Sequence, residues 1–216
     1  MKYTLRFIIY LAGLFLLAIG INLAITSNLG VSPVSSIPLA ISKSIDISLG
    51  TATIGVYAFY VLLQATIFRR ESRLKNFMQL LFSIPFGYFV NLTAGLLQGI
   101  EANSYLMQLL LILLSIVMTS IGVIMFLEMD IVSNAPDGLV LAISEKTKAD
   151  FGKVKIMFDF ISVIVAIIIS LLFVGNISII REGTILSALL TGKMMTIISK
   201  PFSPFLKKIA FDKPKE

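Results

Sequence analysis

The fold of this chain is decided by the stretch Asn28-Leu-Gly-Val-Ser-Pro-Val-Ser-Ser-Ile-Pro-Leu-Ala-Ile-Ser42, a polar, Gly/Pro-broken interval between two long apolar runs. It returns in altered form at Asp130–Ser144, because a shift of 102 positions places Leu39-Ala-Ile-Ser42 on Leu141-Ala-Ile-Ser144 without a gap. Further positions that match in this frame are Gly20 with Gly122, Gly50 with Gly152 and Ile54 with Ile156. The pattern indicates two copies of one unit, each with a broken element, an arrangement that in many transporters marks a binding site.

The composition is that of an integral membrane protein. Of the 216 residues, 57% are hydrophobic and 14% are charged, against roughly 25% charged in an ordinary soluble domain, and the mean hydropathy is +0.96. The first apolar run, Phe7–Ile25, has about the length needed to cross roughly 30 Å of hydrocarbon, and no small-residue cleavage site follows it, so we expect a mature helix. The absence of Cys, His and Trp excludes disulfides, thiol or imidazole catalysis and the usual soft-metal sites.

Six stretches are near the length that a tilted membrane helix needs. They are Arg6–Ile25, Thr51–Phe68, Phe77–Leu97, Tyr105–Leu127, Lys155–Gly175 and Thr184–Ile198. We therefore expect an all-α, polytopic membrane protein, with a first three-helix repeat in residues 1–104 and a second, with a C-terminal tail, in residues 105–216. Because three is an odd number, the second copy must insert upside down, so the predicted fold is a pair of inverted repeats.

The positive charges predict the orientation. Four of them stand in the seven residues Arg69–Lys75, and the C-terminal tail carries Lys200, Lys207, Lys208, Lys213 and Lys215. The positive-inside rule then places both termini and Glu128–Asp150 in the cytoplasm, and Gly99–Ser104 on the outer side of a bacterial plasma membrane. This orientation accounts for the net charge of +6, so we do not expect nucleic acid as a partner.

Each broken element fits two arrangements. A Gly/Pro interval folded back into the membrane needs a cavity or a packed protein interior, because lipid cannot satisfy its N–H and C=O groups. Alternatively, each interval is an ordinary loop that leads into a short interfacial helix, for which Ile37–Ile47 is sufficiently amphipathic.

The starts of the two broken elements supply the candidate substrate-binding residues. In the first, hydroxyl residues and a Pro suit an opening helical turn, whose unpaired N–H groups attract anions. In the second, Asp137 either caps the helix dipole or makes this half of the site suited to a cation or an amine. The full set is Asn28, Gly30, Ser32, Pro33, Ser35, Asn134, Pro136, Asp137 and Gly138.

Three charged residues are predicted at membrane depth. Lys193 lies in the middle of the last span, where an unpaired charge is expensive, so it either pairs with Asp159, binds substrate directly or extends to the cytoplasmic surface. Lys155 also stands one turn before Asp159 and could pair with it. Other polar positions at this depth, for which interhelical hydrogen bonding is the common use, are Asn22, Thr26, Asn91, Ser115 and Thr119.

The sequence contains no constellation typical of an enzyme. It has no Gly-rich phosphate loop and no paired carboxylates at useful spacing on one helix face. We therefore expect no catalytic residues, no cofactor and no metal.

A set of short motifs runs in fixed order along the chain. The motifs are Asn28-Leu-Gly30-Val-Ser-Pro33, Leu49-Gly50-Thr51, Pro136-Asp137-Gly138-Leu139, Leu141-Ala-Ile-Ser144, and Gly183-Thr184-Ile185-Leu186 with Gly192. Together they resemble the YczE/YyaS/YitT family of bacterial membrane proteins over nearly the whole chain. The resemblance implies a polytopic plasma-membrane protein whose biochemical activity is largely unassigned. In that family Lys155 and Asp159 are commonly Arg and Glu, and Pro often stands where this chain has Lys193.

These observations predict a small secondary carrier or permease for a small molecule or ion, with its site near the bilayer midplane between inverted repeats. The alternative is a non-transporting membrane subunit that regulates, scaffolds or binds substrate for a larger transporter. Besides the lipid bilayer, a homodimer or an accessory membrane subunit remains open as a partner.

Overall fold

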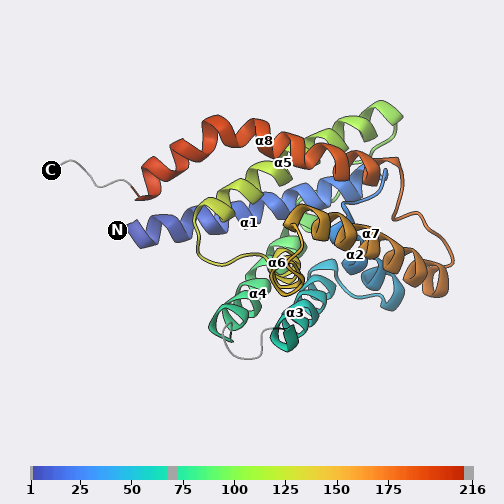
Figure 1. Cartoon of the computed structure of the whole chain (residues 1–216). Helices are drawn as coiled ribbons and strands as arrows, with labels where there is room; N and C mark the ends of the chain where they lie inside the picture. Colours follow the sequence, from blue (N-terminus) through green and yellow to red (C-terminus); the bar gives the residue numbers. More distant parts are fainter. Residues whose placement is uncertain (1, 68–72, 212–216) are drawn as a thin grey trace.

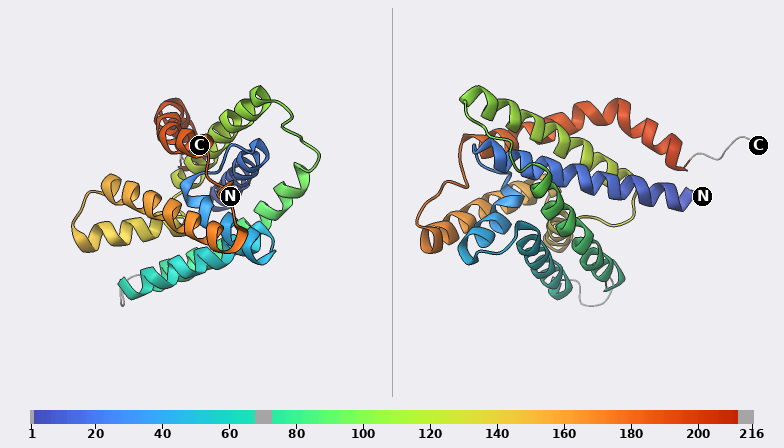
Figure 2. Two further views of the ribbon diagram at one scale, coloured as in Figure 1. Left: turned by 90° about the vertical axis from the view of Figure 1, so that its right-hand side faces the viewer. Right: turned by 180° about the vertical axis from the view of Figure 1, so that it is seen from behind.

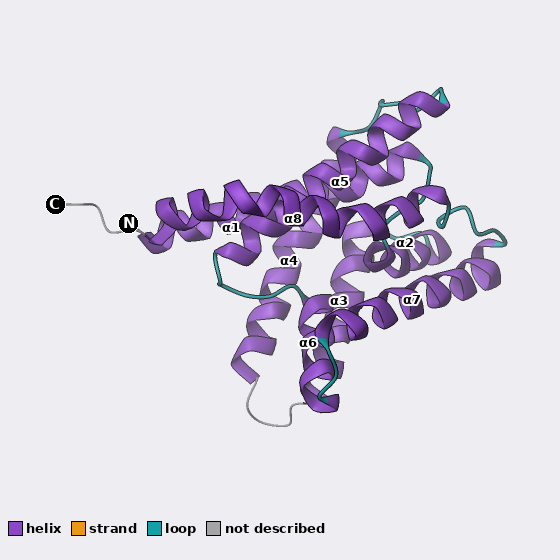
Figure 3. Cartoon of the chain, turned by 45° about the horizontal axis from the view of Figure 1, so that its top comes forward, coloured by secondary structure: helices purple, strands orange, loops and turns teal. Residues whose placement is uncertain are grey.

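The protein is helical throughout the part of the chain that the structure describes. The computed structural model describes residues 2–67 and 73–211, which form eight α-helices and one π-helical turn and contain no strand (Figure 1; Figure 3). The elements are α1 (Lys2–Ser27), α2 (Pro33–Ile45), α3 (Leu49–Ile67), α4 (Arg73–Leu96), α5 (Tyr105–Glu128), α6 (Ala135–Thr147), α7 (Phe151–Ile169), η1 (Ser170–Val174) and α8 (Glu182–Phe211).

The order of helices and turns repeats along the chain. α6 begins and ends 102 positions after α2, and α7 stands in the same relation to α3. Asn28 and Asp130, which lie in the turns after α1 and α5, both have positive φ. At the ends of the short helices, the hydroxyl groups of Ser42 and Ser144 each donate to the carbonyl oxygen five residues further on, at 2.7 Å. The correspondence seen in the sequence is therefore a correspondence of local structure.

Within the described residues each copy contains four helices: one at each of the three predicted spans and a short one in the broken element. The additional helices α2 and α6 have 13 residues each, or about 20 Å, which is too short to cross roughly 30 Å of hydrocarbon. Both have Pro in the first turn, after the N-cap residues Ser32 and Asn134, and both end at a residue with positive φ. The broken elements are thus short helices, because Pro fixes φ for a helix start and removes an N–H that had no partner.

α1 and α5 cross at the centre of the fold. A Cβ on Gly122 would lie 2.6 Å from the carbonyl oxygen of Gly13, so the two backbones touch there. At the repeat-related position, the hydroxyl of Ser115 donates to the carbonyl oxygen of Gly20 at 2.7 Å. Gly20 and Gly122 are 102 positions apart, as are Gly13 and Ser115. The central contact therefore has approximate two-fold symmetry.

Most of the other helix contacts follow the same symmetry. α4 packs on α1 as α8 packs on α5, and α2 packs on α7 as α6 packs on α3. Figure 1 shows α8, α5 and α1 running together on one side of the molecule, and the two views of Figure 2 show α3 and α4 on the other side. The exception is that α3 packs along α4, whereas α7 and α8 diverge.

Several of the polar residues expected between helices do join them. The side-chain amide of Asn22 donates to the carbonyl oxygen of Val90 at 2.8 Å, which ties α1 to α4. The carbonyl oxygen of the Asn91 side chain accepts from the backbone N–H of Gly50 at 2.8 Å, which ties α4 to the start of α3. Together with the Ser115 bond, these contacts confirm interhelical hydrogen bonding for three of the predicted residues.

The protein is embedded in a membrane. Among the described residues, five helices are long and apolar enough to cross a bilayer: α1, α3, α4, α5, and α7 with its π-helical turn. Large apolar side chains are exposed over these helices, and in a bilayer such surface faces lipid. Those on α7 include Ile156, Met157, Phe160, Ile161, Ile164 and Ile168.

The sixth predicted span is not among the five. Thr184–Ile198 lies in α8, which continues without a break to Phe211, so Lys200, Lys207 and Lys208 lie on a helix and not in a tail. The added lysines lower the apolarity of α8, and its 30 residues extend about 45 Å, longer than the hydrocarbon layer. The start of α1 and the end of α8 lie at the same end of the molecule (Figure 1). Of the predicted basic segments, residues 69–72 and 213–215 fall outside the described residues.

Candidate functional site

The turn after α1 packs against the turn before α8. The guanidinium of Arg181 donates to the carbonyl oxygen of Asn28 at 2.7 Å, and the N–H of Gly183 donates to that of Leu29 at 2.8 Å. Gly30 has a φ of 99°, and a Cβ there would overlap the hydroxyl of Thr184. The predicted site residues Asn28 and Gly30 therefore have structural reasons for their positions.

A small cavity opens at the start of α2. Its volume is about 10 Å³, roughly the room of one water molecule. The polar residues that line it come from α2, α5 and α8 and form what we call the hydroxyl cavity: Ser32, Ser35, Ser115, Thr119, Ser187 and Thr191. The hydroxyl of Ser32 donates to that of Ser35 at 3.1 Å, whereas Ser187, only 4% exposed, has no hydrogen-bond partner within the described residues. Pro33 is buried beside the cavity in the first turn of the helix.

The start of α6 is held by side chains of α3 and α4. Asn134 caps the helix by accepting from the N–H of Ala135 at 3.1 Å, and its amide donates to the hydroxyl of Tyr57 at 3.4 Å. The amide of Gln64 donates to the carbonyl oxygen of Ala135 at 3.0 Å, and Pro136 is fully buried in this turn. Gly138 leaves room for Gln64 of α3 and Gln79 of α4, because a Cβ there would lie 2.8 Å from Gln64 Oε1 and would overlap the side-chain amide nitrogen of Gln79. Three elements thus fix the position of this helix start.

Asp137, Lys155 and Asp159 form a charged triad between α6 and α7. Lys155 Nζ lies 3.0 Å from Asp159 Oδ1 and 3.6 Å from Asp137 Oδ1. The side chains are 27% exposed for Lys155 and Asp159 and 32% for Asp137, so the triad is half-buried. Two carboxylates face one ammonium, which leaves an excess of negative charge. Within the described residues, no three acidic, His or Cys side chains form a group that could hold a metal ion.

Aromatic rings line the protein side of the triad. Lys155 Nζ lies 5.6 Å from the centre of the Phe158 ring, and the Phe158 and Tyr60 rings meet edge to face with their centres 5.5 Å apart. Tyr57 stacks on Phe86, with ring centres 5.6 Å apart, and reaches the start of α6 through Asn134. The triad therefore lies beside π faces, which attract cations.

Lys193 does not belong to this triad. Its side chain is exposed on α8, and it makes no ion pair with any described residue. Of the two predicted partners for Asp159, the structure selects Lys155, because residues one helical turn apart share a face whereas α8 diverges from α7.

Comparison with known proteins identifies the family. Residues 4–200 match the model of a family of unknown function (DUF6198). The chain belongs to this family. It is also 25% identical over 206 residues to the uncharacterized protein YyaS of Bacillus subtilis (strain 168), which covers 94% of this chain and 95% of that protein. This agrees with the resemblance in the motifs, and no solved structure matches the chain.

The two helix starts have different surroundings. Repeat-related to the charged triad are Ser35, Thr53 and Tyr57 of the first copy, all uncharged and all buried. The α2 start faces the hydroxyl cavity, and the α6 start faces the charged triad. A single ligand touching both starts stays a prediction, while the charged triad is present in only one of the two copies.

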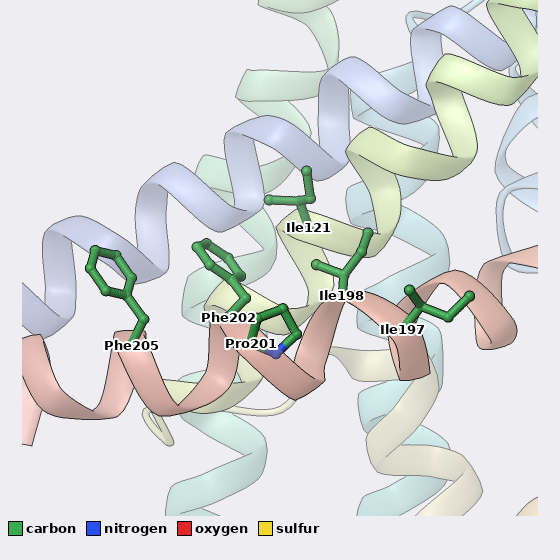
Figure 4. Close-up of a pocket in the computed structure, with 6 residues that line it drawn as sticks. All are labelled: Ile121, Ile197, Ile198, Pro201, Phe202 and Phe205. Carbon is green, nitrogen blue, oxygen red and sulfur yellow. The ribbon is translucent and has the colours of Figure 1, made fainter.

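An apolar groove runs along the surface between α5 and α8. Its volume is about 560 Å³, and Figure 4 shows five of its lining side chains on α8, with Ile121 from α5 closing it. The residues are Ile121, Ile197, Ile198, Pro201, Phe202 and Phe205. No polar side chain lines the groove, so its composition suits a lipid chain or an apolar helix.

Proposed function

We propose that the protein is a small secondary carrier of the bacterial plasma membrane, and that its substrate is a monovalent cation or a small amine. The observation that carries this proposal is the half-buried charged triad at the start of α6. Ionisable residues in membrane segments are expensive to keep and commonly mark the path of a substrate or a proton. The excess carboxylate and the neighbouring aromatic rings both favour a positively charged ligand.

The proposed architecture has six crossings in two inverted repeats. α8 supplies the sixth crossing, because it packs on α5 as α4 packs on α1 and carries a single charge, Lys193, between Glu182 and Lys200. Each copy then crosses three times, with α2 or α6 as a short helix that does not cross. An odd number of crossings inverts the second copy, and the two-fold contact between α1 and α5 is what such an inversion would produce.

This orientation can be tested with single cysteines, since the chain has no cysteine of its own. We expect an impermeant maleimide to label Asn103→Cys and Ser178→Cys in intact cells, because both lie in turns placed outside. Glu145→Cys, exposed at the end of α6, should react only after the membrane is permeabilised. Labelling of Glu145→Cys in intact cells would contradict the inverted arrangement.

The proposed substrate class can be tested by charge movement. We expect liposomes that contain the purified protein to give a saturable current after a rapid jump in the concentration of sodium, potassium, methylammonium, guanidinium or choline. Asp137→Asn should weaken the apparent affinity by about tenfold or more, because it removes a charge-assisted contact. It should leave the amount of folded protein unchanged, since Asp137 faces an open site.

The matched control is Glu145→Gln, which removes an exposed carboxylate from the same helix and should leave the current unchanged. The proposal fails if folded protein gives no current with any of these cations, or if Asp137→Asn behaves like the parent protein. Either result would favour a non-transporting subunit, for which the apolar groove along α8 offers a contact surface.

A further inference from the structure

The first copy is closed where α3 meets α4. A Cβ on Gly50 would overlap the carbonyl oxygen of Gly87, and a Cβ on Gly87 would overlap the side chain of Ile54. The Asn91 side chain completes the contact by accepting from the N–H of Gly50 and donating to the hydroxyl of Ser48 at 3.0 Å. Backbones this close exclude both lipid and water from the space between the two helices.

The second copy carries the corresponding residues but not the contact. Gly152 and Ile156 correspond to Gly50 and Ile54, and an offset of 105 relates Gly192 of α8 to Gly87 of α4. A Cβ on Gly192 would meet nothing within 4 Å, and Ile156 is 73% exposed. Thr196, which corresponds to Asn91, donates only within its own helix, to the carbonyl oxygen of Gly192. The helices that the first copy brings together are therefore apart in the second.

The closed contact between α3 and α4 and the open one between α7 and α8 lie toward opposite sides of the membrane in the proposed orientation. In the proposed orientation α3 starts on the outer side and α7 starts on the cytoplasmic side, so the structure is closed outside and open inside. Burial agrees with this assignment: Thr53 and Tyr57 of the first copy are buried, whereas their counterparts Lys155 and Asp159 are partly exposed. The charged triad is thus accessible from the side where α7 and α8 diverge.

We propose that the protein has a second conformation in which the two copies exchange these arrangements. In it, Gly192 of α8 packs on Gly152 of α7, while Gly87 of α4 separates from Gly50 of α3. This inference rests on the proposed carrier function and names the gate on each side of its site. Exchange of conformations between inverted copies moves access to a central site from one side of the membrane to the other.

The residues at the open gate fit such a closure. Gly192 presents no side chain that would keep the α8 backbone away from α7. Asp150, at the N-cap of α7, corresponds to Ser48 and offers a carboxylate that can accept from the hydroxyl of Thr196, as Ser48 accepts from Asn91. The two glycines, Ser48 and Asn91 of the closed gate therefore each have a small or polar counterpart at the open one.

Disulfide trapping tests the second conformation. In membranes treated with copper phenanthroline, Ile156→Cys with Gly192→Cys should form a disulfide, seen as loss of labelling of both cysteines by a maleimide–polyethylene glycol. The pair is chosen because a Cβ on Gly87 would overlap the Ile54 side chain in the closed gate, so the corresponding residues Gly192 and Ile156 should meet when the second copy closes. Ser48→Cys with Asn91→Cys, whose native side chains are 3.0 Å apart in the closed gate, is the control for the conformation described here, and each single-cysteine variant should be fully labelled once the protein is denatured.

Trapping of both pairs supports the exchange, and trapping of the control pair alone overturns it. If the control pair fails to form, the closed gate itself is not present in the membrane and the proposal falls with it. A second variant keeps the test valid if a cysteine pair disturbs folding. Gly192→Leu should fold, because its side chain has open space, but it should lose the cation-driven current, because the leucine keeps α8 from closing on α7. Since trapping measures helix contact and not transport, a failed carrier function would appear in the current measurements alone.

Discussion

Gly122→Leu is expected to prevent the protein from folding, because it places a side chain where the α1 and α5 backbones touch. A Cβ at this position would already lie 2.6 Å from the carbonyl oxygen of Gly13 and 2.6 Å from the N–H nitrogen of Leu17. Backbone atoms cannot rotate away as a flexible side chain can, so the two central helices must separate. Gly122→Ala should fold but lose about 3 kcal/mol of unfolding free energy, at the upper end of overpacking costs. The measurement is thermal unfolding in detergent.

The control variant should change the free energy of unfolding in the opposite direction. Gly95→Ala on α4 adds a methyl group where nothing lies within 4 Å, and replacing a helical glycine by alanine stabilises a helix by about 0.5 to 1 kcal/mol. A stable Gly122→Leu protein with unchanged melting temperature would show that α1 and α5 do not cross at this point.

The repeated order of the helices was readable from the sequence because the repeat kept its length. The offset of 102 reproduces the bounds of α2 and α3 in α6 and α7 without adjustment. The sequence did not reveal where each helix ends, because the end of a helix depends on its contacts with other helices. α8 runs on to Phe211 through Pro201 and Pro204, where Phe202 is partly buried and Lys207 pairs with Glu128 of α5 at 3.1 Å.

The site was only partly predictable, because the sequence does not show how each helix is rotated about its axis and so which neighbour each side chain meets. The Lys155–Asp159 pair follows from a spacing of four residues on one helix. The contact of Lys155 with Asp137 depends on how α6 turns back onto α7, which no local pattern encodes. The pattern of polar residues could not single out Gln64 or Ser187 either, since either could have faced another helix. Gly138 was the one available signal for the glutamine contact, because it lies against the side chains of both Gln64 and Gln79.

Lys155→Met is expected to have the largest effect within the site. It leaves Asp137 and Asp159 facing each other without the ammonium that lies 3.6 and 3.0 Å from them. Removing one partner of a buried charge cluster costs roughly 3 to 5 kcal/mol, and the partial exposure of this triad reduces the expected loss to about 1 to 3 kcal/mol. Asp159→Asn should cost less, since the Lys155–Asp137 pair remains.

Three further variants separate charge from packing in this prediction. Lys155→Arg keeps the positive charge and should retain most of the stability and the current, whereas Lys153→Met, two residues closer to the helix start and exposed, should change neither. The double exchange Lys155→Asp with Asp159→Lys should recover part of the stability lost in Lys155→Met, because it restores an i, i+4 pair. If Lys155→Met unfolds at the parent temperature in detergent and carries the parent current, the triad is a solvated surface cluster. The site would then have to be sought at the hydroxyl cavity beside α2.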